Sequence, residues 1–548
     1  MGRAQPKSSP TDEHARRIAR ALATGRPPPL DDDLERYCGS SPREVFAAFA
    51  GAARHMPPGG KDAALALGYV VLLQRLLEHL RYRTDCGHAD AAKLIAEFQA
   101  HVAAQVAAGR VDDGMLAYVG GALHQSKIPA SPALAAATAK LAADHAPASV
   151  PVDVRAALAG MLESCGGDPF TAVGMLAEAT HAMPVENRVT LAGALALCGV
   201  PEARGVAVLL LLDESAQVRG AVAAALAQVA GALTPTEVRR LIAMRNWRPE
   251  RERGKIDAIV RTARAGGIEC ACWDAGGVEK LAATAIDGAM AQALVLVSPA
   301  GRKKRMSSIL FKGGIADAWS GEPEPLRRLE ATLAGMHGPI LAVSRAYVDR
   351  TVAHHLAIGS EAGQAPPFGL LQVAETIGGA DWQPARMDFA ETLAGLMSDV
   401  PKPMCEPAAV ASLLRRSGEL ADLEVVAQPW FEDDPAIAET VERARGGDRA
   451  DRAKLAAYLL AVPMQPHRHK WAELFLRTAL WMREASPSGD LCWRELAIVA
   501  KALADGRDMS EIGLMRDIAL RTIAVLDAAD PARHSAFFPG ETVRKRAR

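Results

Sequence analysis

The sequence predicts an all-α protein of stacked helical hairpins that carries one inserted β-hairpin and ends in a C-terminal helical bundle. Three observations lead to this fold class. Hydrophobic residues make up 49% of the chain but aromatic residues only 5%, so the interior must consist mainly of Ala, Leu and Val, and Ala has the highest helix propensity. Prolines recur at intervals close to one helical hairpin. After Gly266 and Gly267, the helical pattern gives way to one typical of strands.

Length and charge limit the organisation and class of the protein. With 548 residues, the chain is too long for a single core. Its net charge of −1 excludes a global field that attracts nucleic acid or an anionic membrane, so any such contact must be local. The predicted segments are a disordered start (1–12), an N-terminal helical region (13–165), helical repeats (166–265), an inserted β-hairpin element (266–320), a helical region (321–427), a C-terminal helical cap (428–530) and a basic tail (531–548).

Two long helices are predicted in the N-terminal region. Residues 62–81 follow a break rich in Pro and Gly at Met56–Gly60, and residues 89–107 form the second helix. Both have apolar faces too broad for isolated surface helices. We therefore expect them to be packed units of the helical array or its N-terminal cap.

The repeat region is defined by three prolines. Pro169, Pro201 and Pro235 each stand where a first helix would begin, a position at which the missing N–H and fixed φ of proline do no harm. The intervals between them are 32 and 34 residues. The spacing predicts three helical hairpins, at about 167–199, 200–231 and 234–265.

The segment that starts at Asp213 predicts the second helix of one hairpin. Either Asp213 or Ser215 can cap the start of this helix. Apolar side chains then recur at helical spacing, at Val218, Val222, Leu226 and Val229. Arg219 follows Asp213 by six positions.

These residues resemble the HEAT-like family of α-solenoids, in which an Asp and a following Val-Arg pair open the inner helix of each hairpin. The resemblance implies that Asp213 and Arg219 bridge neighbouring repeats, while the helical spacing places Val218 and Leu226 in the core of the repeat. Arg188 matches by its offset but has no Asp six positions earlier. The tetratricopeptide period of ~34 residues fits the spacing better, but the Trp and Tyr of that pattern are missing. An irregular helical domain with accidental periodicity is the alternative.

The β-hairpin is predicted after the repeats. Gln292–Val297 and Lys304–Lys312 have strand-like patterns, and Ser298–Arg302 supplies the turn residues between them. Ile268–Trp273 is expected to be a further strand, whereas Ile315–Trp319 is expected to be a short helix. Insertions in a repeat array often map to the working face of the protein, which singles out this hairpin.

Four consecutive basic residues form the candidate partner contact. They lie at the expected hairpin tip, and basic side chains there can hold phosphate through charge-assisted hydrogen bonds. The alternative is a solvated turn whose charges prevent edge-to-edge pairing of strands. No aromatic residue lies between them, so stacking on bases is not supported. The four residues are Arg302, Lys303, Lys304 and Arg305.

No catalytic, cofactor-binding or metal-binding residues are predicted. His354 and His355 are adjacent, so on a helix they point about 100° apart, and packed or exposed histidines are the simpler interpretation. Cys270 and Cys272 share one face of the expected strand but lack zinc spacing and a second pair, which favours core packing. Phosphate-loop and nucleophile-elbow motifs are also missing. A catalytic site would require residues from distant repeats to converge.

The most aromatic helix is predicted at 467–482. Trp471, Leu474, Phe475 and Trp481 follow one face of it. This pattern predicts a compact bundle that caps the array, because terminal repeats need a different outer surface. A ligand pocket under the tryptophans is the alternative.

The predicted function is a cytoplasmic scaffold that binds a macromolecular partner, most simply a protein, on its concave face. Eight scattered cysteines are typical of reduced thiols, the N-terminus has no apolar signal region, and no apolar run approaches the ~18 residues of a membrane span. We therefore expect no membrane contact and no cofactor. Two alternatives are a nucleic-acid-associated protein that uses the basic tip and an unrecognised hydrolase.

Overall fold

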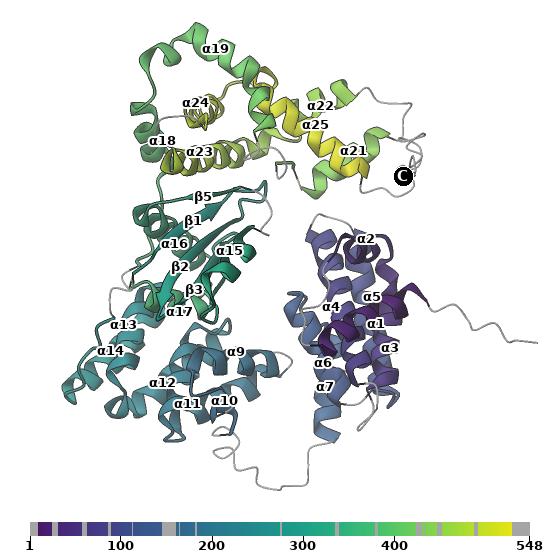
Figure 1. Ribbon diagram of the computed structural model, residues 1–548, viewed down its shortest axis with the longest axis vertical. Coiled ribbons are helices and arrows are strands. Elements are labelled where there is room, and N and C mark those ends of the chain that lie inside the picture. Colours follow the sequence, from purple (N-terminus) through teal and green to yellow (C-terminus); the bar gives the residue numbers. More distant parts are fainter. Residues whose placement is uncertain are drawn as a thin grey trace, which may run out of the picture. The chain divides into compact units, whose positions relative to one another are not determined.

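The computed structural model forms two compact units, one made of Met1–Gly167 with Thr171–Thr190, the other of Asp168–Phe170 with Leu191–Arg548. Both are largely helical (Figure 1). The structure describes residues 9–24, 31–56, 63–85, 89–111, 113–144, 160–163, 165–180, 183–273, 277–334, 339–378, 382–423, 430–432, 434–445, 452–486 and 491–528. The predicted basic tail (531–548) lies wholly outside these residues, and so does most of the predicted disordered start (1–12).

The first unit is built from helices. Helix α1 begins at Pro10, where the Ser9 side chain accepts a hydrogen bond from the Asp12 backbone N–H. The predicted disordered start of 1–12 was therefore wrong for positions 10–12, because the cap was overlooked. The helices in or partly in this unit are α1 (Pro10–Ala23), α2 (Asp32–Ser40), α3 (Val45–His55), α4 (Ala63–Asp85), α5 (Ala89–Ala107), α6 (Asp113–Gln125), α7 (Pro132–Asp144), α9 (Pro169–Thr180) and α10 (Val185–Leu197).

Helix α4 is central to the core of the first unit. It contacts α1, α3, α5 and α6, and Leu72, Leu73 and Leu76 on it are fully buried. Over Ala63–Thr84 it is long and apolar enough to cross a membrane by length and composition, alone among the described helices. The expectation that no segment is long and apolar enough to cross a membrane was therefore wrong. The packing of α4 in the core of the first unit accounts for its apolar character.

Four helices open the second unit. Helices α11 and α13 begin at Pro201 and Pro235, two of the three prolines of the repeat pattern, and Leu226 of α12 is fully buried. Ser215 caps α12 through Val218 N–H, and Asp213 instead accepts a hydrogen bond from Ser215 N–H. The helices are α11 (Pro201–Leu209), α12 (Ala216–Gln228), α13 (Pro235–Met244) and α14 (Glu250–Ala265).

These four helices are followed by a five-stranded antiparallel sheet with strand order β4-β3-β2-β1-β5. The sequence predicted a single isolated hairpin and so too few strands. The hairpin itself is present, with Val295 opposite Ser308, but β4 pairs with one edge of it and β1, followed by β5, lies on the other. The strands are β1 (Lys280–Thr284), β2 (Gln292–Ala300), β3 (Lys303–Phe311), β4 (Ile315–Ser320) and β5 (Ile340–Ala342).

Two further local predictions were wrong. The segment Ile315–Ser320 is strand β4, and Ile268–Trp273 has no regular structure. The periodicity of a short apolar segment does not distinguish a strand from a helix. The segment Ile315–Ser320 is a strand because pairing with β3 supplies hydrogen-bond partners for its backbone. Cys270 and Cys272 therefore do not share a strand face, and Cys272 is exposed.

Helices cover the sheet. Helix α17 (Gly369–Thr376) packs closely against β4, since a Cβ on Gly369 would lie 1.7 Å from the Ala318 carbonyl oxygen. Helix α16 (Arg345–Glu361) also contacts β4, and α15 (Leu326–Ala334) contacts β3. Figure 1 shows α15 and α17 beside the sheet.

The C-terminal part is again helical. Its aromatic helix, α23, pairs with α24, and Trp471, Trp481 and Trp493 are buried between elements of this bundle. The tryptophans thus fill the core. The helices are α18 (Phe389–Ser398), α19 (Pro407–Arg416), α21 (Pro435–Arg445), α22 (Arg452–Ala461), α23 (Arg468–Ala485), α24 (Trp493–Ala504) and α25 (Gly513–Ala528), with a 3-10 helix, η6, at Ser417–Asp422.

Candidate anion-binding site

The four basic residues of the hairpin do not form one cluster. Arg302 lies in the turn, and the other three open β3, where successive side chains point to opposite faces. Lys304 contacts Glu279, and its backbone pairs with Glu324. The Arg305 Nε is buried without a hydrogen-bond partner. The structure therefore leaves only Arg302 and Lys303 fully exposed at the tip.

A second group of basic residues lies between α12 and α14. Arg219 projects from α12, and Arg248 lies just before the start of α14. Their side chains are only 2% and 1% exposed. Both contact one carboxylate, that of Glu252 in the first turn of α14. We call Arg219, Arg248 and Glu252 the buried triad.

The Arg219 guanidinium is held from two sides. Its Nε donates to Glu252 Oε2 at 3.1 Å and its Nη2 to Oε1 at 2.9 Å, a bidentate pairing. Its Nη1 donates to the backbone carbonyls of Asp213 and Glu214, each at 2.8 Å. The side chain therefore fastens the loop before α12 to α14 through the Asp213 and Glu214 carbonyls, and the negative charge of Asp213 also favours the charged form of the guanidinium.

Arg248 completes the triad. Its Nη1 donates to the Leu211 carbonyl and its Nη2 contacts Glu252, but its Nε is buried without a partner. Burial, and then the positive charge of Arg219, lower the pKa of Arg248 to about 9. Burial also lowers the pKa of Arg219. Two guanidiniums thus contact one carboxylate in a poorly hydrated place, and the negative charge of Asp213 raises the pKa of both and offsets part of the cost of their burial.

The triad lines a cavity of about 290 Å³. Arg251 and Lys255 of α14 add two exposed cations to its lining, which then holds four cations and one carboxylate, that of Glu252, while the charge of Asp213 acts on Arg219 and Arg248. The first turns of α12 and α14 also lie at the cavity, and helix N-termini favour negative charge. The other lining residues are Leu211, Ala216, Gly220, Ala223 and Ile256.

A comparable pair nearby has balanced charge. Arg204 Nε donates to both carboxylate oxygens of Glu237 at 3.1 Å, and the two side chains are 8% and 5% exposed. Glu237 also accepts a hydrogen bond from Thr234 N–H in a capping box at the start of α13. One guanidinium therefore faces one carboxylate that is held on both sides.

The adjacent histidines are packed side chains. His355 Nε2 lies 2.7 Å from Arg477 Nη2, and its ring stacks on Phe311 at 4.3 Å between centroids. His354 Nδ1 accepts a hydrogen bond from Met387 N–H at 3.1 Å. Burial and the charge of Arg477 lower the pKa of His354 to about 3 and that of His355 to about 2, so both rings stay neutral at physiological pH.

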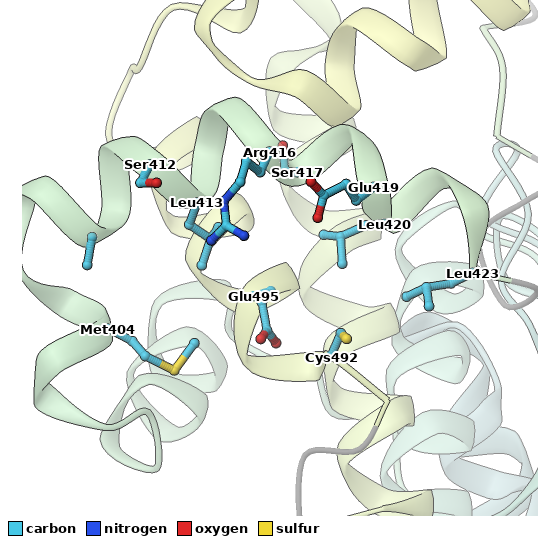
Figure 2. Close-up of a pocket in the computed structure, with 11 residues that line it drawn as sticks. Met404, Ser412, Leu413, Arg416, Ser417, Glu419, Leu420, Leu423, Cys492 and Glu495 are labelled. Atoms are coloured by element: carbon cyan, nitrogen blue, oxygen red, sulfur yellow. The ribbon is translucent and has the colours of Figure 1, made fainter.

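A larger cavity, of about 410 Å³, lies in the C-terminal bundle and is shown in Figure 2. It is bounded by α19, η6 and the start of α24. Its lining mixes Met404 and leucines with Arg416, Glu419 and Glu495. The charges of one arginine and two glutamates do not specify a ligand class, so the triad cavity is the better defined site.

Comparisons with known proteins match two separate regions of the chain. Residues 184–267 match a family model described as the Y4lR second domain, and residues 390–527 match one described as the Y4lR C-terminal helical domain. No curated protein and no solved structure matches the chain. Two regions of this largely helical protein are therefore similar to Y4lR domains.

These matches overturn the resemblance to HEAT-like solenoids. The region that carried it, including Asp213, Val218, Arg219 and Leu226, is assigned to the Y4lR second domain. Any pair of short, well-capped helices gives intervals of this size, so the periodicity reflected hairpin packing and not that family. The whole triad cavity, from Leu211 to Ile256, lies within the matched residues.

Sequence reasoning missed most of this site. Arg219 was assigned a structural role only, and Arg248, Arg251, Glu252 and Lys255 were not singled out. A signal was present, because the four cations of the segment 248–255 outnumber Glu250 and Glu252, the acidic residues that a helix start usually favours.

Proposed function

We propose that this chain is a non-catalytic binding protein that holds an oxyanion group of a partner protein in the triad cavity. The proposal rests on one observation: four cations, two of them buried guanidiniums, line a cavity whose lining contains one carboxylate, that of Glu252. Leaving a buried cation undercompensated is unfavourable, and an anionic ligand relieves that cost. A cytoplasmic location and a protein partner remain predictions.

The cavity is suited to binding and not to proton transfer. Glu252 is its one carboxylate, and two arginines engage it. Arg219 and Arg248 are fastened to backbone carbonyls, so their donors are already oriented before a ligand arrives. Oriented donors reduce the entropy lost on binding.

Titration of the full-length chain with inorganic phosphate tests the proposal. Lys255→Ala removes an exposed cation of the cavity lining and should weaken binding about tenfold, because a hydrogen bond to a charged group contributes ~1.5–3 kcal/mol. Arg264→Ala, an exposed site in the last turn of the same helix, is the matched control and should bind as the wild type does. Calorimetry at constant ionic strength gives the affinities. Equal affinities for all three proteins would contradict the proposal.

A further inference from the structure

We infer that Glu252 occupies the anion site as an internal substitute for the ligand, and that the ligand which displaces it is a phosphomonoester. This inference rests on the proposed oxyanion-binding function and adds to it the ligand class and a built-in means of control. The carboxylate holds the site closed until a stronger anion replaces it.

The position of Glu252 matches that of a bound ligand. Its two oxygens fill the donor fork of Arg219 at 3.1 and 2.9 Å, the arrangement in which arginine also holds phosphate. The Glu252 side chain is 18% exposed, whereas the two arginines behind it are nearly inaccessible. The carboxylate is thus the solvent-side member of the triad.

The arginines do not depend on Glu252 for their orientation. Two backbone carbonyls, those of Asp213 and Glu214, hold Arg219. The Leu211 carbonyl holds Arg248. If the Glu252 side chain rotates toward solvent, the two guanidiniums keep their places and present their donors to the cavity.

Charge selects the ligand class. A carboxylate ligand would replace one single charge by another and would also lose the entropy of association, so it gains little. A phosphodiester likewise has one charge. A phosphomonoester has a charge of about −1.5 to −2 at pH 7 and three acceptor oxygens. It can therefore satisfy both buried arginines and still interact with Arg251 and Lys255 of the lining.

The Arg204–Glu237 pair shows what a purely structural arrangement looks like. Glu237 faces a single guanidinium, is nearly inaccessible, and is held by the Thr234 N–H as well. Its carboxylate has no second arginine to share. These differences make Glu237→Gln a matched control for Glu252→Gln.

The test measures phosphate, O-phosphoserine and acetate binding to the full-length wild type, E252Q and E237Q at constant ionic strength. Removal of the internal competitor should raise the affinity of E252Q for phosphate and O-phosphoserine at least tenfold. E237Q should bind them as the wild type does. Acetate should bind the wild type at least tenfold more weakly than phosphate.

Thermal unfolding provides a second readout, because E252Q leaves Arg219 and Arg248 without the carboxylate that both contact. Phosphate should raise the Tm of E252Q more than that of the wild type, whereas chloride at the same ionic strength should not. If E252Q is too unstable to purify, Glu252→Asp shortens the competitor and should also increase phosphate affinity.

The outcomes separate the two proposals. If the wild type binds phosphate and E252Q or E252D binds it equally or more weakly, Glu252 is not a competitor and this inference is overturned alone. If acetate matches phosphate in the wild type, the ligand class is wrong. If none of the proteins binds phosphate, the proposed function fails as well.

Discussion

The Arg204–Glu237 pair and the buried triad are built on the same plan but differ in charge balance. In each, an arginine bonds a glutamate 33 residues later in the chain. The first pair is complete in itself, with one cation, one anion and a capping box around the anion. The second contains an additional arginine, with the charge of Asp213 acting on both arginines, and opens on a cavity that two further cations line. The difference teaches that a buried ion pair becomes a candidate binding site when its charges do not cancel.

The largest expected effect comes from removing one arginine from each site. Arg204→Met leaves Glu237 buried without its cation and should destabilise the protein by ~3–5 kcal/mol. Arg248→Met leaves Glu252 paired with Arg219, so the loss should stay within ~1 kcal/mol. Urea unfolding of the two variants measures the contrast. Equal losses would mean that the two sites do not differ in charge balance.

A core change separates stability from binding. Leu226 of α12 is fully buried, so Leu226→Ala should reduce the free energy of unfolding by ~2–5 kcal/mol. Because Leu226 does not line the triad cavity, phosphate affinity should be unchanged where the variant is folded. Unfolding and calorimetry on the same preparation test this. A loss of affinity at temperatures where the fold is intact would show that the cavity is coupled to the core of α12.

High pH should affect the triad. The pKa of Arg248 is lowered from 12.5 to about 9 in the folded protein, so the unfolded state binds more protons between those values. The contribution of Arg248 to stability therefore becomes more favourable as pH rises through about 9, since the costly buried charge is lost. Phosphate affinity should fall over the same range, by up to about tenfold per pH unit.

Titrations from pH 7.5 to 10 follow this change. Arg248→Met lacks the titrating group and should show a weaker dependence on pH over this range. An affinity that falls as steeply in the variant as in the wild type would assign the effect to other groups.

The smallest effect is expected at the hairpin tip. Three phosphate contacts there would give a salt slope of about −2.7 on duplex DNA. The structure leaves Arg302 and Lys303 fully exposed, which would reduce the slope to about −1.8. We expect weak or no binding in a titration of labelled DNA and RNA, with the variant that has alanine at all four basic positions as control. Tight binding that this variant abolishes would favour the nucleic-acid alternative.

The sequence predicted local structure well where the signal was local. Pro201 and Pro235 start helices α11 and α13, and the β2–β3 hairpin lies close to its predicted position. The predictions from sequence failed where pairing with another strand determines the secondary structure. Strand β4 was expected to be a helix, and β1 and β5 were overlooked, because β5 has only three residues and depends on pairing with β1.

The sequence by itself determined the mostly helical class, the helix starts and the apolar core positions, since capping, proline geometry and periodicity act over a few neighbouring residues. Only the tertiary structure decided that Arg219 and Arg248 meet at Glu252 and that the four basic tip residues do not form one cluster. Charge balance depends on which side chains share a desolvated space, and residues 33 positions apart reach that space only after the helices pack.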